Sequence, residues 1–200
     1  MRRLILTLFL CFVSYLSFSQ TDIKENQIDI VAGYLENDVA RFPELDGAAS
    51  VETGKGFCFG INYNRKVAKS IWINSGIIFQ RTLNDINPAP TGELLPTIEN
   101  IETEMLRIPV KVRIDFLKWF YLRTGFLIDT ELSNKNETLI DNQSGIGYSL
   151  SLGLNLKIAD TIYINIEPEL GYLTLIPFNS EKYKQHFLLS GINLGIGYRF

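Results

Sequence analysis

The chain has 200 residues, with 19 Lys and Arg against 22 Asp and Glu, a net charge of −3. Removing residues 1–19 leaves 17 basic against 22 acidic residues, and this net charge of −5 excludes the basic stripe that nucleic-acid binding needs. One histidine and a single cysteine beyond that point, Cys58, exclude an intramolecular disulfide and a Cys/His metal cluster.

The first segment has the pattern of a signal peptide. Arg2 and Arg3 precede an almost wholly apolar run over residues 4–16, and Ser17 and Ser19 provide the small residues that a signal peptidase reads. The run is shorter than the roughly 20 residues of a membrane-spanning helix. Leu10 before Cys11 is too bulky for lipoprotein processing. We expect Sec-type export, cleavage before Gln20, and one domain over residues 20–200.

The rest of the chain alternates with a period of two residues. From 147 to 158 the even positions are apolar and the odd positions are small or polar, a pattern that a strand produces and a helix does not. We therefore predict eight strands, at about 28–35, 57–64, 71–80, 106–115, 120–129, 147–158, 162–174 and 187–200. No second apolar segment is long enough for a membrane helix. If the protein spans a membrane, it must do so as a closed antiparallel barrel.

The connections between these strands alternate in length. Short turns are expected at 65–69, 116–118 and 159–160, and long loops at 36–55, 81–103, 132–144 and 175–185. Short periplasmic turns and long outer loops are typical of outer-membrane barrels. This asymmetry places both ends of the mature chain on the periplasmic side.

Aromatic residues of the apolar face fall near the strand ends, as in the two aromatic girdles of a membrane barrel. The outer set is Tyr34, Phe57, Phe79, Tyr148 and Tyr172, and the inner set is Tyr63, Phe116, Phe120, Tyr198 and Phe200. A soluble lipocalin-type barrel would turn its apolar face inward and its charges outward. Here one face is free of charge over several strands while the opposite face carries many charges, and a dry cavity on that face would bury them at heavy cost. We predict an all-β fold, a single eight-stranded up-and-down transmembrane barrel.

Charged residues occupy the inward positions of the predicted barrel. They are Asp29, Arg107, Lys111, Arg113, Asp115, Arg123, Asp129, Glu131, Lys157, Glu167, Glu169 and Arg199. The bases of the fourth and fifth strands face the acids of the seventh, and buried charges need such partners. Trp72, Trp119, Tyr121 and Tyr163 point inward near the periplasmic end. Side chains fill so narrow a barrel; a lumen plugged by ion pairs is preferred here, and a narrow conducting path is the alternative.

No catalytic, cofactor or metal site is predicted. His186 lies on the outward face near the outer rim, where some lipid A-modifying barrels place a His/Ser pair, but position 188 is Leu. Glu167 and Glu169 share one face, where pairing with Lys and Arg is preferred over a metal or acid–base role. Cys58 is expected to be a small filler inside the fold. We predict that the protein is not an enzyme.

The outer loops are strongly acidic. Residues 36–55 carry Glu36, Asp38, Glu44, Asp46 and Glu52 against Arg41, and residues 81–103 carry Asp85, Glu93, Glu99 and Glu102. One interpretation is that these acidic residues only keep the loops solvated. The sharper hypothesis is docking to a basic partner protein or to divalent cations at the lipopolysaccharide surface, with segments 44–51 and 88–95 as the candidates.

The chain ends on an alternating strand with a terminal aromatic residue. Leu194, Ile196, Tyr198 and Phe200 share the lipid face, and Asn193 and Arg199 face inward. This ending resembles the C-terminal assembly signal of Gram-negative outer-membrane barrels. It implies the barrel-assembly machinery as a partner, outer-membrane lipid and lipopolysaccharide as surroundings, and pairing of the last strand with the first.

The mature chain resembles the PorT-like "porin family" of outer-membrane β-barrel proteins. The likeness rests on Gly33-Tyr34, on the stretch from Leu106 to Val110 that contains Ile108-Pro109, and on the ending from Gly197 to Phe200. It implies an eight-stranded barrel in the outer membrane, and some PorT-like proteins are accessories of a type IX protein-secretion system. Three functions stay open: a structural or interaction barrel, a secretion accessory, and a narrow channel.

Overall fold

The computed structural model describes residues 25–42, 50–51, 53–87, 99–134, 142–178 and 184–200. The described parts contain only β-strands and their connections. The strands are β1 (Asn26–Phe42), β2 (Ser50–Val51), β3 (Gly54–Ala68), β4 (Ile71–Asn87), β5 (Glu99–Asp115), β6 (Phe120–Asn134), β7 (Gly145–Lys157), β8 (Ile162–Pro177) and β9 (Lys184–Arg199). No helix within these ranges has the length and apolar character that crossing a membrane requires. The predicted signal segment lies outside the described residues.

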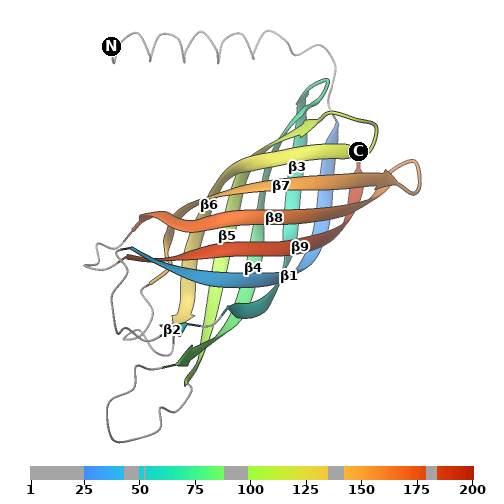
Figure 1. Cartoon of the computed structure of the whole chain (residues 1–200). Helices are drawn as coiled ribbons and strands as arrows, with labels where there is room; N and C mark the ends of the chain where they lie inside the picture. The colour runs from blue at the N-terminus through green and yellow to red at the C-terminus, as the bar shows by residue number, and fades with distance from the viewer. Residues whose placement is uncertain (1–24, 43–49, 52, 88–98, 135–141, 179–183) are drawn as a thin grey trace, which may run out of the picture.

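Eight long antiparallel strands close into a barrel in which sequence neighbours are also spatial neighbours (Figure 1). β1 pairs with β3 on one side and with β9 on the other, so the first and last strands form the closing seam. Asn26 and Phe200 exchange backbone hydrogen bonds of 2.8 and 2.9 Å at the periplasmic end of this seam. The two-residue β2 only extends β4 at its outer end. The predicted eight-stranded meander and the closure at Phe200 are confirmed.

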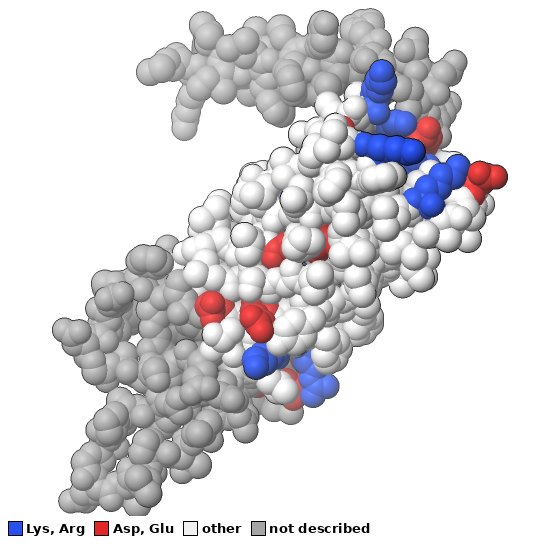
Figure 2. Space-filling model, turned by 45° about the vertical axis from the view of Figure 1, so that its right-hand side comes forward, with Lys and Arg blue, Asp and Glu red and all other residues white. Residues whose placement is uncertain are grey.

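The barrel is apolar outside and polar inside. Ile30 and Ile196 are 68% and 63% exposed on the outer wall, whereas Asp29 and Asn64 are buried inside. Figure 2 shows a wall that is largely free of charge, with Lys and Arg gathered at the end that carries the short turns. This arrangement is stable where hydrocarbon surrounds the wall, and it excludes a lipocalin-type soluble barrel.

The strands run further on the outer side than predicted. β1 continues to Phe42, β4 to Asn87, and β5 begins at Glu99, so the predicted loops at 36–55 and 81–103 are partly strand. About 9–11 residues suffice for a strand to cross a bilayer, and these strands have 17. Beyond the hydrocarbon both faces of a strand meet polar surroundings. The hydrophobic alternation therefore fades there although the backbone pairing continues.

Pro109 interrupts the hydrogen-bond ladder in mid-wall. Between Ser75↔Val110 and Ile78↔Arg107 the pairing of β4 with β5 is broken, because proline has no N–H to donate. The Ile108-Pro109 step therefore marks a local gap in backbone pairing, and Pro109 itself points into the buried interior.

Candidate functional site: the lumen and its periplasmic mouth

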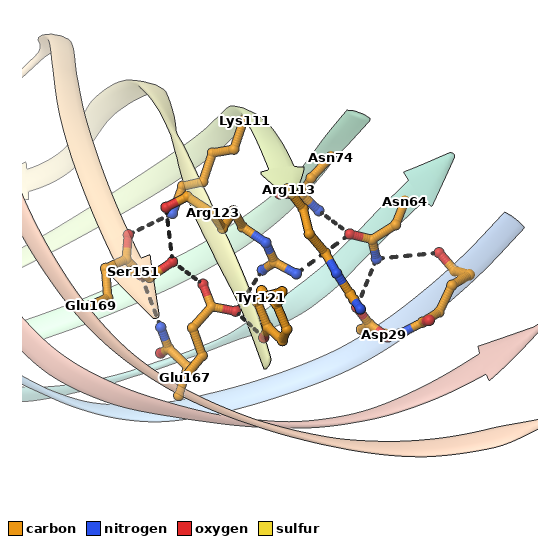
Figure 3. Close-up of polar contacts among 12 residues, drawn as sticks. Asp29, Asn64, Asn74, Lys111, Arg113, Tyr121, Arg123, Ser151, Glu167 and Glu169 are labelled. Atoms are coloured by element: carbon orange, nitrogen blue, oxygen red, sulfur yellow. Dashed lines mark hydrogen bonds and ion pairs between the residues drawn. The ribbon is translucent and has the colours of Figure 1, made fainter. Parts of the chain in front are cut away.

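Two ion pairs cross the middle of the lumen. Lys111 Nζ of β5 lies 2.5 Å from Glu169 Oε1 of β8, and Arg123 Nη1 of β6 lies 2.8 Å from Glu167 Oε2 of β8 (Figure 3). All four side chains are almost completely buried. The prediction that bases of the fourth and fifth barrel strands meet acids of the seventh is confirmed.

Neutral side chains complete the coordination of these acids. Glu167 accepts hydrogen bonds from Tyr121 Oη at 2.6 Å and from Ser151 Oγ at 2.5 Å. Asn193 Nδ2 donates to Glu169 at 2.9 Å. Charges are tolerated in a low-dielectric interior only when such partners are present, so the network stabilises one closed arrangement of the lumen.

A second polar chain joins this network to the first strands. Asn64 Nδ2 donates to Asp29 Oδ2 at 2.7 Å, and Gln27 donates to the other Asp29 oxygen at 2.6 Å. Arg123 Nη2 reaches Asn64 Oδ1 at 3.5 Å, and Asn74 donates to the same oxygen at 3.0 Å (Figure 3). The hydrogen bonds therefore continue from β8 across the lumen to β1.

An apolar layer fills the lumen on the outer side of the charged network. It consists of Leu35, Cys58, Met105, Leu127, Leu173, Phe187 and Leu189, with Ile78 packed against it. A further buried ion pair, Arg107 Nε to Asp129 Oδ1 at 2.7 Å, accompanies it. The sequence interpretation treated the interior as polar and missed this layer. Its signal was present in Leu35, Leu127 and Leu189, which are apolar residues at inward positions.

The space left between these side chains is very small. A cavity of about 20 Å³ lies between the ion pairs and the strands that carry Asn62, Asn74 and Asn193. One water needs roughly 10–15 Å³ measured in this way. At this level the space between the ion pairs fits about one water molecule.

A larger cavity opens at the periplasmic end of the lumen. Its volume is about 250 Å³. It is lined by Arg113, Asp115, Leu117, Lys118, Trp119, Phe120, Asn155, Lys157, Tyr163 and Arg199. Below it, stacked cations and aromatic rings form its floor: Arg113 lies 4.1 Å from the Tyr121 ring and 5.4 Å from Trp72, and Arg199 lies 3.9 Å from the Tyr163 ring.

Hydrogen bonds hold this floor in place. Asp115 accepts from Arg113 Nε at 2.7 Å and from Trp72 Nε1 at 2.8 Å. Arg199 donates to Gln27 Oε1 at 2.9 Å and to Tyr163 Oη at 3.0 Å. The predicted inward positions of Trp72, Tyr121 and Tyr163 are confirmed. Trp119 differs, because it lies in the turn between β5 and β6 and is 52% exposed at the edge of the mouth.

The mouth carries a net positive charge. Four cations and one carboxylate line it, and of the cations the exposed Lys118 and the half-exposed Lys157 face the periplasm. Lys157 pairs with Asp160 at 3.1 Å, an exposed contact that contributes little stability. A rigid aromatic floor under exposed cations is suited to binding an anionic group.

The other singled-out residues lie away from the mouth. His186 is only 8% exposed, with its ring 5.2 Å from the ring of Tyr172, while Leu188 is exposed on the same outward face. Cys58 is buried in the apolar layer, with its thiol 3.3 Å from Asn193 Oδ1, and is the filler that was predicted. Within the described ranges no group of three or more His, Cys, Asp or Glu is arranged to hold a metal ion.

The acidic outer segments are described only in part. Glu36, Asp38 and Glu102 belong to β1 and β5, and Asp38 is exposed. Glu44, Asp46, Glu52 and Glu93 lie outside the described residues, as do nearly all of the segments 44–51 and 88–95. Docking at these loops stays a prediction.

Comparison with known proteins identifies the fold. No protein-family model matches the chain, and no curated protein matches it. Among solved structures, the outer membrane protein OprG from Pseudomonas aeruginosa superposes with a TM-score of 0.59 at 13% identity, over 88% of this chain and 96% of that one. Neisserial surface protein A superposes with a TM-score of 0.57 at 11% identity, over 88% and 97%. Together with the apolar wall, this fold assigns the chain to the outer membrane as an eight-stranded β-barrel.

Proposed function

We propose that this protein is a non-conducting outer-membrane barrel of the interaction type, which binds an acidic segment of a periplasmic partner at its mouth. The closed lumen is the observation that carries the first half of this proposal. An ion that crossed it would have to separate buried ion pairs and then pass an apolar layer, and both steps are costly. The rigid barrel then serves to present its ends to other molecules.

Planar-bilayer recording tests whether the barrel conducts. The mature protein is inserted into a bilayer, and current is followed over a range of voltages. We expect a flat baseline. Reproducible conductance steps that persist with independent preparations would reject the plugged lumen in favour of the narrow channel.

Recovery of partners from native outer membranes tests the role of the mouth. We expect the tagged wild-type protein to recover a periplasmic or membrane-anchored partner. The double variant Lys118→Glu/Lys157→Glu reverses the two most accessible charges of the mouth and should lose that partner. Lys55→Glu, an exposed lysine at the outer end, is the matched control. Equal recovery by all three proteins would exclude the mouth as the binding site and favour the outer loops.

A role as an accessory of a protein-secretion system is the second candidate. The resemblance to PorT-like proteins favours it, and so does a basic mouth that opens toward the periplasm, where secreted chains approach the outer membrane. Co-purification with secretion-machinery subunits, lost in Lys118→Glu/Lys157→Glu, would support this narrower role over a general interaction barrel.

We propose that the barrel has no enzymatic activity. His186 packs on Tyr172 and has Leu188 where a nucleophile would be needed. Unchanged lipid A mass spectra from cells with and without the protein are the expected result.

The signal peptide also stays a prediction. We expect N-terminal sequencing of the mature protein to begin at Gln20.

A further inference from the structure

We propose that the outer wall over β1, β3 and β4 binds one anionic phospholipid of the periplasmic leaflet. An acyl chain lies in an apolar hollow of this wall, and the phosphate lies on Arg65 and Lys69. This inference rests on the membrane-spanning fold and is independent of the proposed role of the mouth.

The hollow is a depression in the lipid-facing wall. Its volume is about 740 Å³, within the range of small-ligand pockets, and apolar atoms make up nearly all of its lining. Ala32 lies at its floor, paired in register with Phe59 of β3 and Leu194 of β9. The hollow exists because a methyl group stands there among large side chains, Ile30, Phe59 and Ile61, which are all more than half exposed.

The periplasmic end of the hollow is polar. Tyr63 lines the hollow, and its hydroxyl donates to Asn26 Oδ1 at 2.6 Å, as expected of a tyrosine at the membrane–water interface. Arg65 follows on the same outward face of β3, roughly 6.6 Å further along the strand. Lys69 is exposed in the turn that follows β3.

These two cations have no acidic partner in the described part of the chain. Lys66 between them pairs with Glu25 at 2.9 Å, whereas neither Arg65 nor Lys69 forms an ion pair with a described residue. Both side chains are exposed at the end of the barrel that carries the short turns. The apolar hollow suits the acyl chain of an anionic lipid, and the unpaired cations suit its phosphate. Each cation near an anionic membrane surface strengthens the attraction between protein and lipid.

The position along the barrel selects the class of lipid. Arg65 and Lys69 lie at the end of the short turns, which faces the periplasm, so phospholipid of the inner leaflet reaches them and lipopolysaccharide of the outer leaflet does not. A zwitterionic lipid would fill the hollow equally well but would gain less from the cations. We therefore expect phosphatidylglycerol to bind more tightly than phosphatidylethanolamine.

Native mass spectrometry of the full mature barrel tests the site, with phosphatidylglycerol or phosphatidylethanolamine added to the detergent. We expect one retained phosphatidylglycerol per barrel. Arg65→Gln/Lys69→Gln should weaken it by roughly ten- to thirty-fold, with little effect on phosphatidylethanolamine. Ala32→Phe, which fills the hollow, should weaken both lipids. Ala32→Leu is the milder alternative, and heat-modifiable gel migration verifies that each variant is folded.

Matched controls lie elsewhere on the barrel. Lys55→Gln removes an exposed cation from the other end of β3, and Leu152→Phe enlarges an exposed side chain on the wall of β7. Both should retain the lipid. Retention by Arg65→Gln/Lys69→Gln or by a folded Ala32 variant would overturn the proposal. The proposal would also be overturned if the wild-type barrel were a dimer and Ala32→Phe a monomer, because a second copy of the chain would then occupy the hollow.

Discussion

Arg123 and Glu167 pair at 2.8 Å across the lumen, from β6 to β8, with each side chain about 95% buried. The pair links the two walls directly, and Glu167 is also the acceptor for Tyr121 and Ser151. Loss of one partner would leave the other as an unpaired charge in the interior of the barrel.

We therefore expect Arg123→Met to lower the free energy of unfolding by about 3–5 kcal/mol. The double variant Arg123→Met/Glu167→Gln should lose less, because no lone charge stays behind and Gln still accepts hydrogen bonds. Urea unfolding of the barrel refolded in lipid vesicles, followed by tryptophan fluorescence, measures both. Lys157→Met, which breaks the exposed pair with Asp160, is the control and should cost about 1 kcal/mol or less.

A separate prediction concerns the contribution of the apolar layer to stability. Phe187 is completely buried within it, so Phe187→Ala should lower the free energy of unfolding by about 3–5 kcal/mol through lost contacts and a cavity. Phe126 is 54% exposed on the lipid-facing wall, and Phe126→Ala should cost clearly less in the same unfolding assay. Equal losses would mean that the layer inside the lumen is not tightly packed.

Much of this architecture could be predicted because a barrel wall imposes strict alternation. Period two from Gly147 to Lys157 located β7 and separated its faces, and the opposite charges of Arg123 and Glu167 predicted their pairing. The outer ends of β1 and β4 could not be located, since no hydrocarbon forces alternation there.

The apolar layer and the mouth were harder to foresee. Leu127 and Leu189 occupy inward positions of the alternation, but they are apolar like their lipid-facing neighbours, so residue type alone does not distinguish them from the wall. Trp119 lies in a turn beyond the last paired residue of β5, where strand parity no longer applies, so it lines the edge of the mouth but is not buried in the lumen. Which cations surround the mouth depends on how the ends of β5, β7 and β9 meet beside the β5–β6 turn.

Gly153 of β7 offers a test of the floor below the mouth. A Cβ atom at this position would overlap the ring and hydroxyl of Tyr121, which donates to Glu167. We expect Gly153→Ala to displace Tyr121 and to cost about 1–3 kcal/mol in the unfolding assay. Gly171→Ala is the matched control, because a Cβ there meets only Leu189 and Ser149 at 3.4–3.6 Å. If both variants unfold alike, Tyr121 is not held where the network needs it.

A variant of the C-terminal residue can distinguish assembly into the outer membrane from the stability of the folded barrel. Phe200 exchanges backbone hydrogen bonds with Asn26, but its side chain is 55% exposed and stacks on Tyr198, at 6.0 Å between ring centroids. Phe200→Ala keeps the backbone bonds and should leave the free energy of unfolding within about 1 kcal/mol of wild type. In cells, however, it removes the aromatic residue that the barrel-assembly machinery is expected to read. We expect a several-fold lower amount of folded protein in the outer membrane, measured by heat-modifiable migration after matched expression.

The control for this prediction is an aromatic residue at the same end of the barrel but away from the last strand. Phe116 follows β5 in the β5–β6 turn and is 51% exposed, close to the exposure of Phe200. Phe116→Ala therefore removes a similar amount of apolar surface from the membrane interface without changing the C-terminal strand, and it should assemble normally. Equal assembly of the two variants would show that Phe200 is only one more residue of the aromatic girdle.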